Sequence, residues 1–116
     1  MAMSGGQMGG GLEIELAPPR GHNFAIPLPT VTADTQLFTR QCYLRGWSLR
    51  ENTGSADAHL EFYDGLDANG TLLAALDIIK ATSDQANWSG GGIRCRIGLF
   101  VNVIAGSVRG AVFVRN

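Results

Sequence analysis

The sequence predicts an all-β domain: an antiparallel β-sandwich with a jelly-roll-like path, seven or eight strands and a flexible glycine-rich N-terminal arm. Two observations support this prediction. Short runs of alternating apolar and polar residues recur at intervals of roughly 8–12 residues with turn residues between them, which is typical of sandwiches and barrels. No segment has a convincing helical pattern. We expect one domain over residues 12–116, preceded by an arm of residues 1–11, and a chain of this length can bury about two-thirds of the surface that it exposes when unfolded.

The arm is predicted from composition. Five of residues 1–11 are glycine and none is charged, so this segment has too little apolar surface to offset the entropy lost on ordering. Two interpretations are open: a disordered leader, or an arm that orders against a neighbouring subunit. For the second interpretation, the candidate contact residues are Met1, Met3 and Met8.

Residues 12–16 are predicted to form a half-buried strand, because three apolar residues alternate there with two glutamates. Residues 18–36 are predicted to be an extended, proline-containing segment. Pro27 and Pro29 exclude a helix or a central strand. This segment therefore belongs at an edge or on the surface, where both prolines are candidate partner contacts.

Residues 37–52 are the longest strand candidate, and Gly46 in their middle predicts a bulge or a close approach of another segment. The next strand candidate covers residues 58–66. The Asn-Gly pair that follows it is the strongest short hairpin signal. Residues 71–80 suit a strand or a helix, because several of their apolar residues also fall at helical spacing; the preceding hairpin signal and the short length favour a strand.

Residues 82–92 are predicted to be a loop. Three strands are expected after it, over residues 93–97, 99–104 and 108–115, with glycine-containing turns between them. The last two strands are rich in valine, which is typical of strands.

Residues 85–116 contain four arginines and no acidic residue, so they carry a charge of +4. Residues 1–84 carry −5. Alternation places these arginines on outward faces: Arg94, Arg96, Arg109 and Arg115. Three roles are open. The arginines pair across strands with glutamates (the candidates are Glu13, Glu15, Glu51 and Glu61), dock on an acidic protein surface, or contact phosphates. The third role is the least favoured, because few aromatic residues lie among the arginines.

Overall composition sets further limits. Charged residues make up 16% of the chain, below the norm of about 25%, which suggests that a partner covers part of the surface. The net charge of −1 gives no overall reason to bind nucleic acid or an anionic membrane. The longest apolar stretch is too short for a membrane helix and no signal peptide is visible. We therefore expect synthesis in the cytoplasm and neither a nucleic-acid nor a membrane partner.

No catalytic residue, cofactor or metal site is predicted. Ser55, Asp57 and His59 give only a weak hint of a hydrolase. The acidic turn at residues 64–69 lacks two key ligands of an EF-hand loop, so a turn is favoured over a looser calcium site. The cysteines and histidines lack the spacing of a zinc site, and the glycine-rich segments do not fit nucleotide-binding loops.

The chain contains two cysteines and two tryptophans. Cys42 and Cys95 are expected to be buried thiols, and a disulfide between them is possible only if their strands are neighbours. Trp47 is expected in the core. Trp88 has three open interpretations: it covers the open end of the sandwich, it anchors a protein partner, or it stacks against a sugar.

Over residues 42–115, the segments "YLRGWSLREN", "HLEFYDG" and "GGIRCRIGLFVNVIAGSVRGAVFVR" have the pattern of a compact β-sandwich. With its glycine-rich arm and low charge, the chain resembles the small all-β virion proteins of tailed bacteriophages that decorate capsids or form minor parts of the particle. The resemblance implies a structural role on the virion, often as a trimer or a larger symmetric cluster. The implied partner is the major capsid protein or another virion protein.

The function expected from the sequence is therefore that of a non-enzymatic structural protein. It would decorate or stabilise a phage capsid by binding the major shell protein through residues 1–11, residues 18–29 or both. The alternative is a carbohydrate-binding or host-facing module of the virion. A small hydrolase around His59 is a third and weaker hypothesis.

Overall fold

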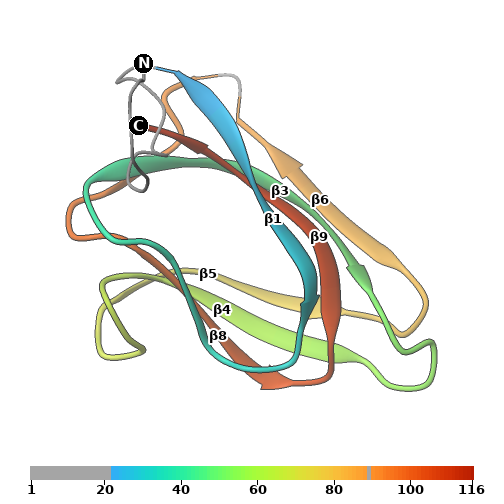
Figure 1. The fold of residues 1–116 in the computed structure, drawn as a ribbon. Coiled ribbons are helices and arrows are strands. Elements are labelled where there is room, and N and C mark those ends of the chain that lie inside the picture. Colours follow the sequence, from blue (N-terminus) through green and yellow to red (C-terminus); the bar gives the residue numbers. More distant parts are fainter. Residues whose placement is uncertain (1–21, 89) are drawn as a thin grey trace, which may run out of the picture.

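The computed structural model describes residues 22–88 and 90–116, which fold into two antiparallel sheets packed together, with no helix in this part of the chain (Figure 1). The prediction of an all-β fold with two packed antiparallel sheets is confirmed. The predicted arm and the predicted strand at residues 12–16 lie outside the described residues. The strands are β1 (Asn23–Val31), β2 (Thr35–Phe38), β3 (Cys42–Glu51), β4 (Ala58–Asp64), β5 (Thr71–Ile78), β6 (Ser83–Asn87), β7 (Ile93–Cys95), β8 (Leu99–Ala105) and β9 (Val108–Arg115).

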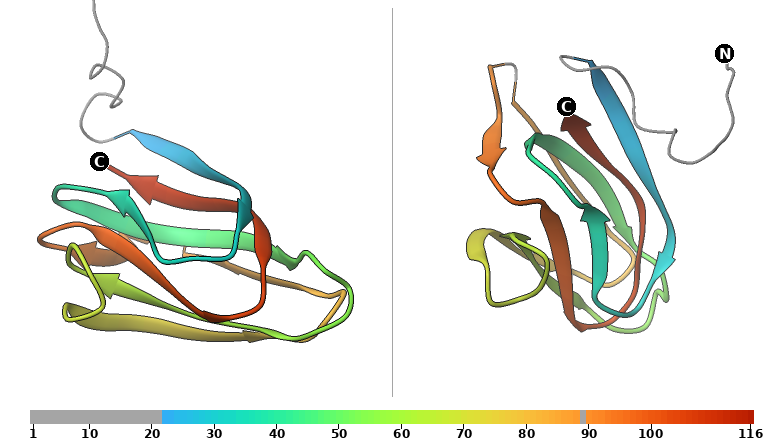
Figure 2. Two further views of the ribbon diagram at one scale, coloured as in Figure 1. Left: turned by 60° about the horizontal axis from the view of Figure 1, so that its bottom comes forward. Right: turned by 60° about the vertical axis from the view of Figure 1, so that its left-hand side comes forward.

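Most sheet partners are distant in the sequence. The first sheet has the order β1-β9-β3-β6, with β7 also paired to β3, and the second has the order β2-β8-β4-β5. In Figure 1 the blue strand β1 and the red strand β9 lie side by side in the upper sheet, although they stand at opposite ends of the described chain. Figure 2 shows the same two layers from two further sides.

The core lies between the sheets because the inward residues of each strand are apolar. On β3 these include Leu44, Trp47 and Leu49, and on β4 they include Leu60 and Phe62. The ring centroids of Trp47 and Phe62 are 5.2 Å apart across the core. Burying side chains of this size contributes roughly 1.5–3 kcal/mol each, so alternation along the strands is the main cause of the layered fold.

The predicted irregularity at Gly46 is present. The register of β3 against β9 shifts between Leu44 and Gly46, and Gly46 has a φ of 154°. A Cβ atom there would lie 2.1 Å from the backbone oxygen of Ala86 on β6. Glycine is therefore required, both for the backbone conformation and for the close approach of β6.

Two predicted elements differ from the structure. The strand candidate at residues 37–52 is divided at residues 39–41, where the chain passes from β2 in the second sheet to β3 in the first. The predicted loop at residues 82–92 contains β6, which pairs with β3 from Arg50 opposite Ser83 to Gly46 opposite Asn87. The polar sequence of β6 has no apolar alternation, so its conformation depends on pairing with β3 rather than on its own composition.

Other predicted elements are present. Residues 71–78 form a strand, β5, which pairs with β4 in a hairpin. Its turn is closed by the N–H of Gly70, which donates to the oxygen of Asp67 at 3.3 Å. The proline-containing segment supplies β1, which lies at the edge of the first sheet with Pro27 and Pro29 exposed. This agrees with the exclusion of a central strand.

Candidate functional site

The outward residues of the first sheet form one continuous surface. Alternating burial along each strand and the register of the strand pairs define which side chains point outward. Five of these residues are arginines and none is acidic. We call this surface the arginine face; it consists of Asn23, Ala25, Pro27, Tyr43, Arg45, Ser48, Arg50, Ser83, Gln85, Asn87, Arg94, Arg109, Ala111, Phe113 and Arg115.

Four of these arginines lie at the two ends of the face. At one end, Arg115 and Arg94 both lie opposite Tyr43, on either side of β3. At the other end, Arg109 lies directly opposite Arg50. Tyr43 and Arg50 are seven positions apart on β3, and the bulge takes up one of these positions, so at about 3.4 Å per residue the ends are about 20 Å apart. Uncharged residues occupy the centre, where the ring of Phe113 lies.

The sequence did not identify Arg45 and Arg50 as outward-facing candidates for partner contact. Strict alternation along β3 would place them on opposite faces, because they are five positions apart. The bulge at Gly46 shifts the alternation, so both point outward. The glycine in the strand was the sequence signal for this shift.

The predicted ion pair with Glu51 is wrong, because this carboxylate points to the inside of the sandwich. Glu51 is 1% exposed. Its carboxylate accepts hydrogen bonds from the N–H and the hydroxyl of Thr53, both at 2.6 Å, and from the N–H groups of Gly54 and Ala81, at 2.6 and 3.0 Å. These donors, the Thr53 hydroxyl foremost, lower the pKa of Glu51 from 4.5 to about 2, although burial acts in the opposite direction.

The predicted ion pair with Glu61 is also wrong, because Glu61 lies on the second sheet, where it accepts a hydrogen bond from the hydroxyl of Tyr63 at 2.6 Å. The remaining predicted partners, Glu13 and Glu15, lie outside the described residues. Within residues 22–88 and 90–116, the only ion pair joins His59 and Asp77.

The side chains of Arg50, Arg94, Arg109 and Arg115 form no hydrogen bond or ion pair with any described residue. Arg45 differs, because its guanidinium group donates to the backbone oxygen of Trp88 at 2.8 and 3.2 Å. The arginine face therefore presents uncompensated positive charge, most of it at the two ends.

The outward side of the second sheet has the opposite character. Its strands contain no arginine or lysine, and Glu61 and Asp77 lie on its outer side. Leu72 and Ile104 expose 52% and 59% of their surface. The two outer faces of the sandwich thus differ in the sign of their charge.

Three grooves lie along the arginine face. One of about 430 Å³ is lined by Arg50, Arg109, Ser48 and Ser83, among others. A second of about 380 Å³ lies between Arg45 and Phe113. A third of about 440 Å³ lies at the centre, where its lining includes Ser48 and Phe113. These grooves are open to solvent, so they are shallow hollows on the face rather than enclosed pockets.

The other residues identified in the sequence have different positions. Met1, Met3 and Met8 lie outside the described residues. Arg96 lies in the turn between β7 and β8, off the arginine face. Trp88 is half-buried, with its ring edge-on to Trp47 at a centroid distance of 5.5 Å. This position fits the interpretation in which Trp88 covers the core.

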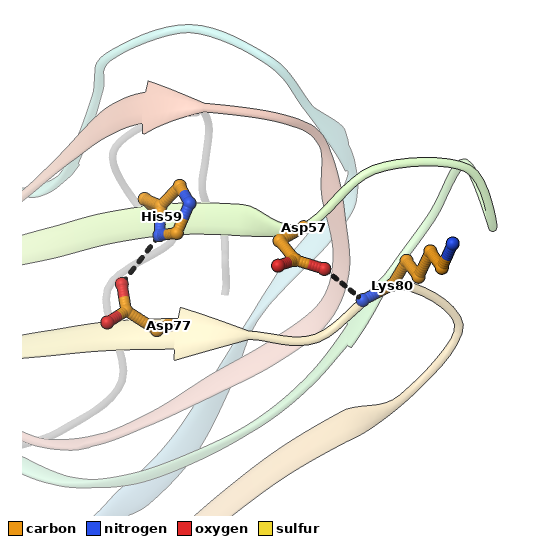
Figure 3. Close-up of polar contacts among 4 residues, drawn as sticks. All are labelled: Asp57, His59, Asp77 and Lys80. Atoms are coloured by element: carbon orange, nitrogen blue, oxygen red, sulfur yellow. Dashed lines mark hydrogen bonds and ion pairs between the residues drawn. The ribbon is translucent and has the colours of Figure 1, made fainter.

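The residues of the suggested hydrolase are used in separate contacts. His59 Nδ1 lies 2.6 Å from Asp77 Oδ1, whereas Asp57 accepts a hydrogen bond from the backbone N–H of Lys80 at 2.9 Å (Figure 3). The hydroxyl of Ser55 donates to the hydroxyl of Thr53 at 3.2 Å. The structure therefore does not bring Ser55, Asp57 and His59 together as a trio.

The acidic turn also has structural roles. Burial acts to raise the pKa of Asp64, but the N–H groups of Arg96, Ile97 and Gly98, which donate to its carboxylate at 2.9 to 3.3 Å, lower it overall. Among the described residues, no cluster of three or more His, Cys, Asp or Glu side chains could hold a metal ion. No helix in this part of the chain is long and apolar enough to cross a membrane.

Cys42 and Cys95 are neighbours, which the sequence left open. They lie directly opposite each other on β3 and β7, and both are buried as free thiols. A hydrogen bond with Cys95 and burial raise the pKa of the Cys42 thiol far above its usual range. The pair lies where β7 meets β3, and it faces the core rather than the arginine face.

Comparison with known proteins gives no relative: no protein-family model, no curated protein and no solved structure matches this chain.

Proposed function

We propose that this protein is a non-enzymatic structural protein of a bacteriophage particle, which decorates or stabilises the capsid by docking on an acidic surface of the major shell protein. The observation that carries this proposal is the arginine face, with five outward arginines and no acidic residue. The phage setting rests on the resemblance of the sequence to small virion proteins.

The pattern of the face supports a protein partner. Protein interfaces commonly have an uncharged centre with aromatic residues and a polar, charged rim. Here Phe113 lies at the centre, and arginines lie at both ends. Complementary charge contributes register and rapid association more than affinity, which suits a protein that must occupy many equivalent positions on a shell.

The finer fold assignment, a jelly roll, belongs to the same proposal. A jelly roll has eight strands in two sheets and is common in viral capsid proteins and in lectins. The orders β1-β9-β3-β6 and β2-β8-β4-β5 support it, with β7 as a short addition beside β3.

The test is co-sedimentation of the purified protein with empty capsids of the phage that encodes it. Arg109→Gln and Arg115→Gln combined should weaken binding about tenfold or more, because they remove two charges from the face. The matched control combines Arg40→Gln and Arg96→Gln, which lie off the face. Equal binding by the two variants would count against docking through the arginine face.

A second test concerns the arm. Deletion of residues 1–11 is expected to leave the sandwich folded and to abolish incorporation into particles. Circular dichroism checks the fold, and the protein content of purified particles checks incorporation. Normal incorporation of the truncated protein would remove the arm from the proposal.

The proposal includes a homo-oligomer, with a trimer favoured. Light scattering during size-exclusion chromatography measures the mass directly. A trimer or larger ring supports assembly before docking, whereas a monomer favours a module that binds its shell one copy at a time.

The alternative function is a carbohydrate-binding module of the virion. One observation favours it: the central groove of about 440 Å³ places the amides of Gln85 and Asn87 beside the ring of Phe113, and sugars bind to such combinations of amides and aromatic rings. A glycan array tests this alternative. Binding that is lost in Phe113→Ala or Trp88→Ala, with folding intact, would support it, and no binding by the intact protein would exclude it.

A further inference from the structure

We propose that Arg50 and Arg109 form a site for a carboxylate group that a partner protein presents. This inference rests on the proposed function, and it names the chemical group that one end of the arginine face recognises. The two residues are direct partners in the antiparallel pairing of β3 with β9. Both side chains are exposed and point to the outer side of the sheet.

The arrangement is unfavourable without a ligand. Side chains directly opposite each other on antiparallel strands have Cβ atoms about 5 Å apart, and like charges at this position are destabilising. Neither guanidinium group has a hydrogen bond or an ion pair with a described residue. An oxyanion between them would remove the repulsion and accept bidentate, charge-assisted hydrogen bonds.

The surroundings supply further donors and no competing acceptor charge. The groove of about 430 Å³ that contains both arginines is also lined by Ser48 and Ser83, whose hydroxyl groups can donate to an anion. Glu51 also lines the groove, but it is 1% exposed and its oxygens already accept hydrogen bonds from Thr53, Gly54 and Ala81. Its charge is therefore directed away from the two guanidinium groups.

The distribution of charge favours a protein carboxylate over a nucleic-acid phosphate. A nucleic-acid backbone needs a continuous positive track, whereas this face has uncharged residues between its two charged ends. The second sheet, with Glu61 and Asp77 on its outer side, adds negative charge that would repel a polyanion. A single carboxylate on a partner surface would match Arg50 and Arg109, which lie directly opposite each other.

The test uses sodium acetate as the probe and nuclear magnetic resonance of the arginine Nε–Hε groups in the full chain. Sodium chloride at equal ionic strength corrects for screening. Acetate should give saturable shifts at Arg50 and Arg109. Arg109→Gln should weaken the response of Arg50 about tenfold, whereas Arg94→Gln, which removes the same charge elsewhere on the face, should leave it unchanged. Equal shifts at Arg94 and Arg115, or no saturable shift at Arg50 and Arg109, would overturn the site.

A single-stranded oligonucleotide of about 12 residues is the competing probe. If it displaces acetate and shifts the Nε–Hε resonances of all five arginines of the arginine face at physiological salt, the carboxylate assignment is overturned in favour of phosphate. If acetate remains bound at Arg50 and Arg109, the assignment is supported.

Capsid binding separates this inference from the proposed function. If the intact chain binds capsids and the combined Arg50→Gln and Arg109→Gln variant binds equally well, the carboxylate site has no role and the proposed function stands. If acetate binds as expected but the intact chain does not bind capsids, the proposed function fails and the site stands.

Discussion

Glu51 connects the turn after β3 with the segment before β6, since its carboxylate accepts hydrogen bonds from Thr53, Gly54 and Ala81. A pKa lowered in the folded state, from 4.5 to about 2, means that ionised Glu51 stabilises the fold above pH 4.5. This stabilisation is lost as the pH falls towards 2.

Glu51→Gln should therefore lower the melting temperature at pH 7 by several degrees, because a neutral amide accepts these hydrogen bonds less well and brings a donor of its own. The difference from the intact protein should shrink between pH 4.5 and pH 2. Thermal unfolding across this pH range is the measurement. Asp67→Asn is the control, because Asp67 is exposed and an asparagine there can still accept the hydrogen bond from the N–H of Asn69; an equal loss in both variants would contradict the role of Glu51.

Cys42 and Cys95 should resist alkylation in the folded protein. Both are buried, and the raised pKa of Cys42 leaves little of the thiolate, which is the reactive form. Mass spectrometry after iodoacetamide treatment should show slow labelling at pH 8, and complete labelling in denaturant. Rapid labelling of the native protein would show that β7 opens from β3.

At the scale of the element, β3 depends on one backbone position. Gly46→Ala should destabilise the protein by about 2 kcal/mol or more, because the new Cβ would lie 2.1 Å from the oxygen of Ala86 and the φ of 154° is unfavourable for alanine. Chemical denaturation measures the loss. Gly91→Ala is the control, since a Cβ there meets nothing within 4 Å, and an equal effect of the two changes would argue against strain at the bulge.

The conformation of β6 could not be predicted from its own sequence. Its sequence, Ser-Asp-Gln-Ala-Asn, contains no alternation that a single-sequence pattern can detect. Its pairing with β3, far away in the sequence, makes it a strand. The β4–β5 hairpin was predictable because its signal, an Asn-Gly turn between two apolar runs, is local. Local signals thus predicted the hairpin and the bulge, whereas non-local pairing determined β6.

The same distinction applies to the candidate site. Alternation placed Arg94, Arg109 and Arg115 outward, and the structure has them on one face. Arg45 and Arg50 joined this face only through the shift at Gly46, and the direct opposition of Arg50 and Arg109 depends on the register of β3 against β9. No pattern within one strand specifies that register.

For the whole molecule, charge is separated by face rather than by overall amount. The net charge is −1 and the pI is about 6.0, yet we expect retention on a cation-exchange resin at pH 7 and low salt, because one face is arginine-rich and lacks carboxylates. Combined Arg50→Gln and Arg109→Gln should elute at lower salt than combined Arg40→Gln and Arg96→Gln. The two variants have equal net charge, so identical elution would contradict a localised positive face.

Pro27 and Pro29 on β1 have a consequence for aggregation. Exposed edge strands are the positions at which sheets of separate molecules join into fibrils, and a missing N–H donor interrupts that joining. β1 lacks two such donors, whereas β5, the edge of the second sheet, has eight residues with no proline and one charge. Fibril growth from partly unfolded protein should therefore begin at β5, and Ala75→Lys on that edge should slow the rise of thioflavin T fluorescence, whereas a lysine in place of Ala25 on β1 should not.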